Sequence, residues 1–183
     1  IFINDTSLKL KAEILREKGT NRAAYFRGEF DKYGWKSLGS SYLLSDILAA
    51  KLLSQLEELE QITTKRKIIW QHYYVSLQAL ESDGKCRLPI IPEYANHNGH
   101  MFYLVCDNEK ERNDLITHLR KKQIQSTFHY LSLHQSDYFK NKYTGDQLPN
   151  SDRFTDCIIR LPLHPQLELS KQNKVIDKII SYY

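Results

Sequence analysis

The chain has 183 residues, 41% of them hydrophobic and 26% charged, which is enough to bury one core in an ordinary globular fold. A formal net charge of +4 is too small to indicate a nucleic-acid-binding protein, and no apolar run approaches the ~20 residues that a membrane-spanning helix needs. The cysteines at 86, 106 and 157 form no CxxC pair, which favours free thiols in the cytoplasm over a disulfide framework.

The first predicted elements are the end of a strand and a helix. Residues 1–3 are typical of a strand end, and the chain has no initiator methionine, so we expect it to be a piece of a longer protein. Apolar residues at helical spacing then predict a helix over residues 7–18. Gly19 stands where a left-handed glycine commonly ends a helix.

Residues 20–41 show no clear periodicity but are rich in basic and aromatic side chains. Arginine offers a planar fork to phosphate oxygens, and tyrosine or tryptophan offers a face on which a base or a sugar can stack. The segment therefore predicts either a nucleotide or sugar-phosphate site or an ordered loop that packs on a partner subunit. The residue types alone do not separate the two.

A long helix is predicted over residues 45–81, capped by Ser45 or Asp46 and ending before Gly84. Its length indicates that it connects two domains or bends near residues 63–64. The segment 39–42, GSSY, leads into this helix, whose N-terminus could bind an anion, although serines at helix starts are more often simple caps.

The remainder is expected to form a small domain of strands and helices. Strands are predicted over residues 100–106, 124–130 and 157–161. Asn108, with a glutamate three residues later, should cap a helix that runs to residue 122, and Ser170 should cap the last helix. The fold class is therefore α/β, with residues 1–43, 44–84 and 85–183 as its successive parts.

Two histidines, His129 and His134, follow the second predicted strand five residues apart. They could face a cleft, but no third ligand stands at a spacing that suits a metal. The chain also lacks the Walker, GxGxxG, CxxC, HExxH and GxSxG motifs.

Several stretches together resemble the sugar aminotransferases of the DegT/DnrJ/EryC1/StrS family. They are KGTNR at 18–22, FRG at 26–28, DKY at 31–33, GSSY at 39–42, FHY at 128–130 and RLPL at 160–163. They occur in the family's order and span nearly the whole chain.

The resemblance implies the C-terminal part of a fold-type-I enzyme that uses pyridoxal 5'-phosphate. The family's cofactor lysine lies in a serine-, phenylalanine- and histidine-rich strand end, and no lysine of this chain has that context. The implied reaction moves an amino group from glutamate to the C4 ketone of a dTDP-4-keto-6-deoxyhexose, for surface polysaccharide synthesis. We expect this chain alone to be inactive.

The resemblance also implies a homodimer with shared active sites. By that comparison the cofactor phosphate is contacted by Ser40, Ser41 and Tyr42. The sugar-nucleotide pocket is shaped by Arg27, Tyr33, Trp35, His129, Tyr130 and His134.

Two other hypotheses remain open. The basic and aromatic loop could belong to a stand-alone module that binds nucleotides or single-stranded nucleic acid by stacking and cationic contacts, with steep salt dependence. Alternatively, the chain could be a dimerisation fragment without ligand affinity.

Overall fold

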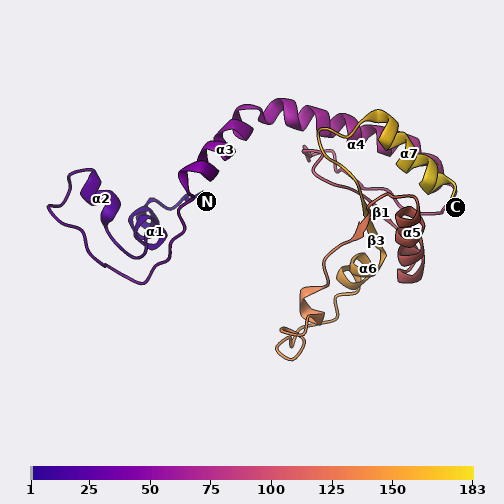
Figure 1. Ribbon diagram of the computed structural model, residues 1–183. Helices are drawn as coiled ribbons and strands as arrows, with labels where there is room; N and C mark the ends of the chain where they lie inside the picture. The colour runs from indigo at the N-terminus through magenta and orange to yellow at the C-terminus, as the bar shows by residue number, and fades with distance from the viewer. Residues whose placement is uncertain (1) are drawn as a thin grey trace. The chain divides into compact units, whose positions relative to one another are not determined.

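The computed structural model describes residues 2–183, which divide into two compact units, residues 2–57 and residues 58–183. Figure 1 shows the helices and strands of both units. The division into residues 1–43, 44–84 and 85–183 stays a prediction.

The first unit contains the 3-10 helix η1 (Thr6–Leu8) and the helices α1 (Lys9–Arg16), α2 (Arg22–Phe26) and α3 (Asp46–Glu57). The predicted helix over 7–18 is thus a 3-10 turn followed by α1, and the carboxylate of Asp5 caps the turn by accepting from the amide of Ser7 at 2.9 Å. Gly19 has φ 77°, as predicted for a left-handed glycine after a helix.

The segment 20–41 has more structure than its lack of periodicity indicated. It contains α2 and two isolated antiparallel bridges, Glu17 to Ser41 and Thr20 to Trp35. The bridges bring Gly19 and Gly39 so close that a Cβ on Gly39 would lie 2.1 Å from the Gly19 nitrogen. Both glycines of the family motifs are therefore required by the close approach of two backbones.

The predicted long helix is divided at Glu58 and not near residues 63–64, so that bend was misplaced. Glu58 has φ −96° and ψ 9°, and α4 (Leu59–Ser82) runs through both threonines. β-branched residues lower helix propensity only slightly, which is why Thr63 and Thr64 do not interrupt it. The predicted cap of α3 is present, because the Ser45 hydroxyl accepts from the amide of Leu48 at 3.4 Å.

The second unit is built on a three-stranded antiparallel sheet in the order β1 (Phe102–Val105), β3 (Ile158–Leu161), β2 (Thr127–Phe128). Phe102 pairs with Leu161, and Thr127 pairs with Arg160. All three strands fall inside the ranges predicted from the sequence, although each is shorter. The α/β class is confirmed.

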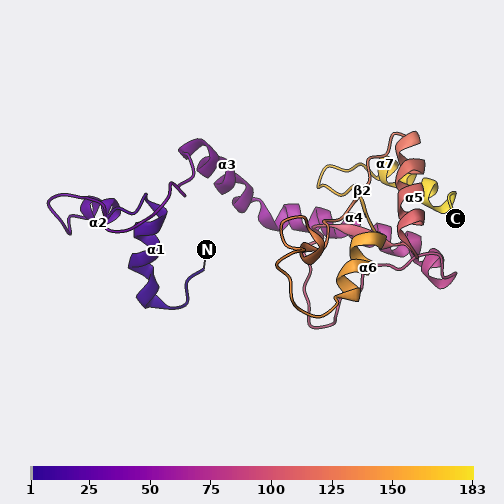
Figure 2. The ribbon, with the colours of Figure 1, turned by 90° about the horizontal axis from the view of Figure 1, so that it is seen from below.

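Helices cover both faces of the sheet. Side chains of one face, such as Leu104 and Ile159, join a core with α4, α5 (Glu109–Lys121) and α7 (Leu169–Ile180). The other face places Val105 and Ile158 against Cys157 of α6 (Pro149–Cys157). Helix α6 contacts β1 and β2, and it lies beside α5 (Figure 2).

The ends of two helices test the predicted caps. The Asn108 side chain accepts from the Glu111 amide at 3.0 Å, and the Glu111 carboxylate accepts from the Asp107 amide at 2.8 Å. This pair of bonds is close to the predicted capping box. The Ser170 cap was wrong, because α7 begins at Leu169 with Glu168 before it. The sequence analysis also missed α6.

Candidate functional site

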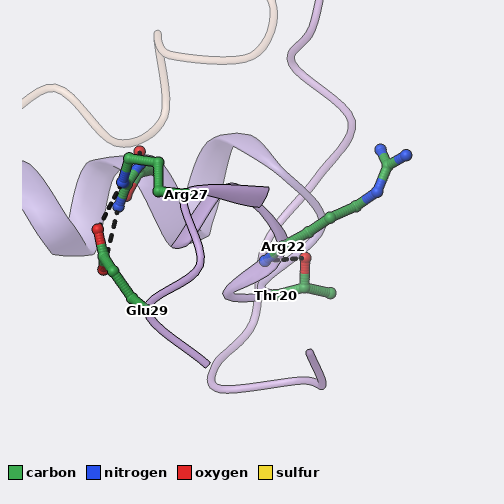
Figure 3. Close-up of polar contacts among 5 residues, drawn as sticks. Thr20, Arg22, Arg27 and Glu29 are labelled. Atoms are coloured by element: carbon green, nitrogen blue, oxygen red, sulfur yellow. Dashed lines mark hydrogen bonds and ion pairs between the residues drawn. The ribbon is translucent and has the colours of Figure 1, made fainter. Parts of the chain in front are cut away.

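In the first unit, the guanidinium of Arg27 is held between two carboxylates. It contacts Glu13 through Nη1 at 2.5 Å and Nη2 at 3.0 Å, and its Nε lies 2.6 Å from Glu29 (Figure 3). These bonds lower the pKa of the Glu13 carboxyl, chiefly through the hydrogen bond from Arg27. Because both carboxylates engage its guanidinium, Arg27 ties the loop to α1.

The KGTNR stretch forms its own network around Glu17, which is buried. Arg22 donates to the Glu17 carboxylate at 2.9 Å, and the Thr20 hydroxyl donates to the Glu17 carbonyl at 2.8 Å. The Asn21 side chain accepts from the Gly34 amide at 2.9 Å. The motif therefore sets the path of the loop by local bonds.

Two aromatic side chains of the loop differ in their surroundings. The ring of Tyr33 lies 5.5 Å from the ring of Tyr25, so it is braced by a neighbour. Trp35 is 83% exposed although its backbone is bridged to Thr20. An exposed indole on a fixed backbone provides a face for stacking.

The predicted cofactor segment, Ser40 to Tyr42, lies against the end of α1. The Ser40 amide donates to the Leu15 carbonyl at 3.0 Å, and the Tyr42 amide donates to the Arg16 carbonyl at 3.1 Å. All three residues, Ser40, Ser41 and Tyr42, are exposed. Their hydroxyls are thus presented from a backbone that is held in place.

The hydroxyls of Ser40, Ser41 and Tyr42 are chemically suited to a phosphate group, because neutral hydroxyls can donate hydrogen bonds to its oxygens. The N-terminus of α3 is a poorer candidate, since Ser45 already caps it and Asp46 places a carboxylate in its first turn. Of these two places, the hydroxyl segment is the one better suited to a phosphate group.

In the second unit, His134 lies on a cavity of about 410 Å³. Its Nε2 is 3.0 Å from Oδ1 of Asp152, in the first turn of α6, and its ring centroid is 5.3 Å from that of Tyr143. Both of these neighbours also line the cavity. The structure thus places one predicted substrate residue at a cavity whose lining includes both polar and apolar groups.

The other two predicted residues of this unit lie just before it in the chain. The ring of His129 is 5.3 Å from the ring of Tyr130, and its Nδ1 is buried without a hydrogen-bond partner among residues 2–183. Tyr130 is 79% exposed, and its carbonyl accepts from the Thr155 hydroxyl at 3.4 Å. Neither residue is among those that line the cavity.

Sequence reasoning missed Tyr143 and Asp152 as parts of this site. They lie in a polar stretch without periodicity, and only folding brings them to His134. One signal was present: Pro149 with an acid three residues later is typical of a helix start. The same stretch is tied down by the buried Ser132, whose hydroxyl lies 2.8 Å from that of Thr155 and 3.1 Å from that of Ser151.

Over residues 2–183, no group of three or more histidine, cysteine, aspartate or glutamate side chains is arranged to hold a metal ion. In the same part of the chain, every helix is too short or too polar to cross a bilayer.

Residues 1–180 match the sequence model of the DegT/DnrJ/EryC1/StrS aminotransferase family, and the chain belongs to this family.

Solved structures agree with this assignment. The aminotransferase TlmJ from Streptoalloteichus hindustanus has a TM-score of 0.83 at 21% identity, over 98% of this chain and 45% of that protein. A family aminotransferase from Brucella abortus has a TM-score of 0.80 at 26% identity, over 99% and 45%. The PLP form of the putative sugar aminotransferase Spr1654 from Streptococcus pneumoniae has a TM-score of 0.79 at 23% identity, over 98% and 45%. The chain therefore spans about 45% of the length of these proteins.

Proposed function

We propose that this chain is the C-terminal part of a sugar-nucleotide transaminase that converts a dTDP-4-keto-6-deoxyhexose to dTDP-4-amino-4,6-dideoxygalactose with glutamate as the amino donor. The observation that carries the proposal is the family match over residues 1–180. The order of the motifs from KGTNR to RLPL favours this substrate within the family. The product would serve surface polysaccharide synthesis in the cytoplasm.

The proposed cofactor is pyridoxal 5'-phosphate, which withdraws electrons from the bond that must break during amino transfer. It is supported by the similarity to Spr1654, solved in PLP and PMP forms. In this chain the hydroxyls of Ser40, Ser41 and Tyr42 would donate to its phosphate. Their fixed backbone would hold those donors in position without reorganisation when the cofactor binds.

The proposed substrate residues act in two groups. Arg27, through its bonds to Glu13 and Glu29, would keep the loop in the conformation in which Tyr33 and Trp35 present their rings to the nucleotide. His129, Tyr130 and His134 would contact the substrate from the second unit. The active protein would be a homodimer, as the resemblance implies.

We further propose that residues 1–183 do not catalyse transamination alone, because none of their lysines stands in the sequence context of the cofactor lysine. The test is to incubate the native protein, as its host produces it, with PLP, glutamate and dTDP-4-keto-6-deoxyglucose. The expected product is a dTDP-4-amino sugar, identified by mass and by NMR. Recovery of a 3-amino product would contradict the assigned position, and no amino sugar from any keto sugar nucleotide would contradict the function.

Residues 1–183 as a separate polypeptide are the matched control in that assay. We expect them to give no amino sugar. Turnover by this polypeptide alone would refute the claim that it lacks the essential lysine.

A further inference from the structure

Two of the three cysteines lie far apart in the sequence, but the fold of the second unit brings them together. Cys86 follows the turn that ends α4, and Cys106 comes directly after β1. Both side chains are buried in the same core, and both thiols are free. Neither cysteine has a part in the proposed function.

The register of the backbone places these two cysteines opposite each other. Arg87 and Val105 form an antiparallel bridge and exchange both backbone hydrogen bonds, at 3.0 Å from the Arg87 amide and 2.9 Å from the Val105 amide. The next residues along such a ladder face each other without hydrogen bonds, with their Cα atoms about 4.5 Å apart. One residue before Arg87 and one after Val105, these are Cys86 and Cys106.

The two thiols also point to the same side. Successive side chains of a strand alternate between its two faces. Arg87 is exposed, and Val105 packs in the cluster on the opposite face of the sheet. Their neighbours share the main core, which contains Cys86, Leu88, Leu104 and Cys106. A Cα separation of about 4.5 Å falls within the range that a disulfide spans.

The electrostatics of the pair oppose two thiolates but not a disulfide. Burial raises the pKa of the Cys86 thiol to about 12, and the neighbouring Cys106 raises it further because two thiolates repel each other. The Tyr183 hydroxyl lies 3.9 Å from Sγ of Cys106 and adds another buried polar group. A disulfide is neutral, so it removes two ionisable groups from this core.

Cys157 is also a neighbour of Cys106, but it is placed differently. Its carbonyl accepts from the Cys106 amide at 2.9 Å, so a backbone hydrogen bond joins the two residues. The Cys157 side chain ends α6 and packs with Val105 and Ile158 on the other face of the sheet. It is therefore not directed at the Cys106 thiol and provides an internal control.

The segment that carries Cys86 lies at the outer edge of β1. Strand β3 pairs with the other edge of β1. The segment is held by the two backbone bonds of Arg87 and by the Glu81 carboxylate, which accepts from the Leu88 amide at 2.8 Å. An edge segment held in this way opens locally at lower free energy than a central strand. Such an opening lets a small oxidant reach the thiols slowly.

We infer that Cys86 and Cys106 form a cross-strand disulfide when the protein is oxidised, with glutathione disulfide as the oxidant. One protein thiolate attacks a sulfur of glutathione disulfide and releases one glutathione thiolate. The second protein thiolate then attacks the protein sulfur of this mixed disulfide and releases the other glutathione. The two thiols lose two protons and two electrons, and the oxidant is reduced to two molecules of glutathione. The new bond ties the turn after α4 to β1.

The first test compares the folded and the unfolded protein in mixtures of reduced glutathione and glutathione disulfide. The native protein is equilibrated in buffer and in denaturing urea, each time from the reduced and from the oxidised side, so that slow access to the thiols does not affect the result. Acid quenching, alkylation and peptide mapping by mass spectrometry give the fraction of Cys86 that is joined to Cys106.

In the unfolded chain the two thiols meet only through a flexible loop, at an effective concentration on the order of 1 mM. Their placement across the ladder should raise the equilibrium constant for the disulfide at least ~tenfold in the folded protein. An equal or smaller constant in the folded protein would overturn the inference.

Two variants that each remove one buried thiol test which cysteines pair. Cys157→Ser should leave the fraction of the Cys86–Cys106 disulfide unchanged, and Cys106→Ser should leave Cys86 without an intramolecular partner. A disulfide that includes Cys157 as the main product would overturn the inference. If Cys106→Ser does not fold, the peptide map of the oxidised wild-type protein decides in the same way.

Hydrogen exchange measures the effect of the bond on the edge segment. The disulfide should keep this segment on β1, so the Arg87 amide should exchange more slowly in the oxidised than in the reduced protein. Equal or faster exchange would contradict a bond across this ladder. None of these measurements needs a substrate, so their outcome is independent of the proposed function.

Discussion

Tyr73 of α4 provides the sharpest prediction about what holds the second unit together. Its side chain is fully buried, and its hydroxyl donates to the carbonyl of Pro162 at 3.0 Å. Pro162 belongs to the RLPL stretch that leaves β3, so one hydrogen bond joins the long helix to a family motif. The change Tyr73→Phe removes that bond and keeps the ring against Phe102, at a centroid distance of 5.2 Å.

The expected cost follows from the loss of one side-chain hydrogen bond in a partly buried setting. The net value of such a bond is about 0.5–1.5 kcal/mol, and an unsatisfied partner carbonyl raises the cost toward about 2 kcal/mol. We therefore expect Tyr73→Phe to lower the free energy of unfolding by about 1–2 kcal/mol. For a domain of this size, that corresponds to a fall in Tm of roughly 3–8 °C.

Urea unfolding followed by tryptophan fluorescence measures this loss. Trp70 is buried in the core of the second unit, so the measurement uses a Trp35→Phe background to remove the exposed indole of the first unit. The matched control is Tyr74→Phe, since Tyr74 stacks on Trp70 but donates no hydrogen bond within residues 2–183. If Tyr73→Phe and Tyr74→Phe differ by less than about 0.5 kcal/mol, the bond to Pro162 does not stabilise the fold as argued.

Three further predictions concern a cap, a close contact and the thiols. Asn108→Ala removes the acceptor for the Glu111 amide and should cost about 1 kcal/mol in the same urea assay; an unchanged midpoint would contradict the cap. Gly99→Ala should lower the Tm of the chain more than Gly84→Ala. Both glycines have positive φ, but only at Gly99 would the new Cβ meet backbone, at 2.8 Å from the Arg66 carbonyl carbon. Equal Tm values for the two variants would refute this. Burial raises the pKa of the Cys86 and Cys106 thiols to about 12, so the reactive thiolate should be scarce at about pH 8. Iodoacetamide at about pH 8 should therefore label these cysteines only after the chain is unfolded. Rapid labelling of the folded chain would contradict their burial.

The parts of the fold that the sequence predicted are those with strong local signals. The long helix that buries Tyr73 and Leu77, the Asn108 cap and the strand around Leu104 were each predicted from the spacing of residues within a short stretch. The break at Glu58 carries no glycine or proline, so local propensity does not mark it. Helix α6 is short and polar, and it buries only Cys157, so its sequence has no clear apolar stripe.

The sequence allowed single residues of the candidate site to be predicted, but not the contacts between them. The motifs pointed to Arg27 and His134, but not to the partners that fix them. Glu13 lies in the preceding helix, and Asp152 follows a polar stretch whose ends meet only after folding. Those pairings depend on long-range contacts, which the spacing of residues in the chain does not encode.

The central claim is that this chain contributes binding residues to a PLP-dependent sugar aminotransferase without providing its cofactor lysine. The most direct test is to reduce the PLP-loaded native protein with borohydride and to map the pyridoxylated peptides by mass spectrometry. The account predicts no stoichiometric pyridoxyl group on any lysine of residues 1–183. A single lysine of this chain modified at one equivalent, with loss of transaminase activity when it is changed to alanine, would contradict it.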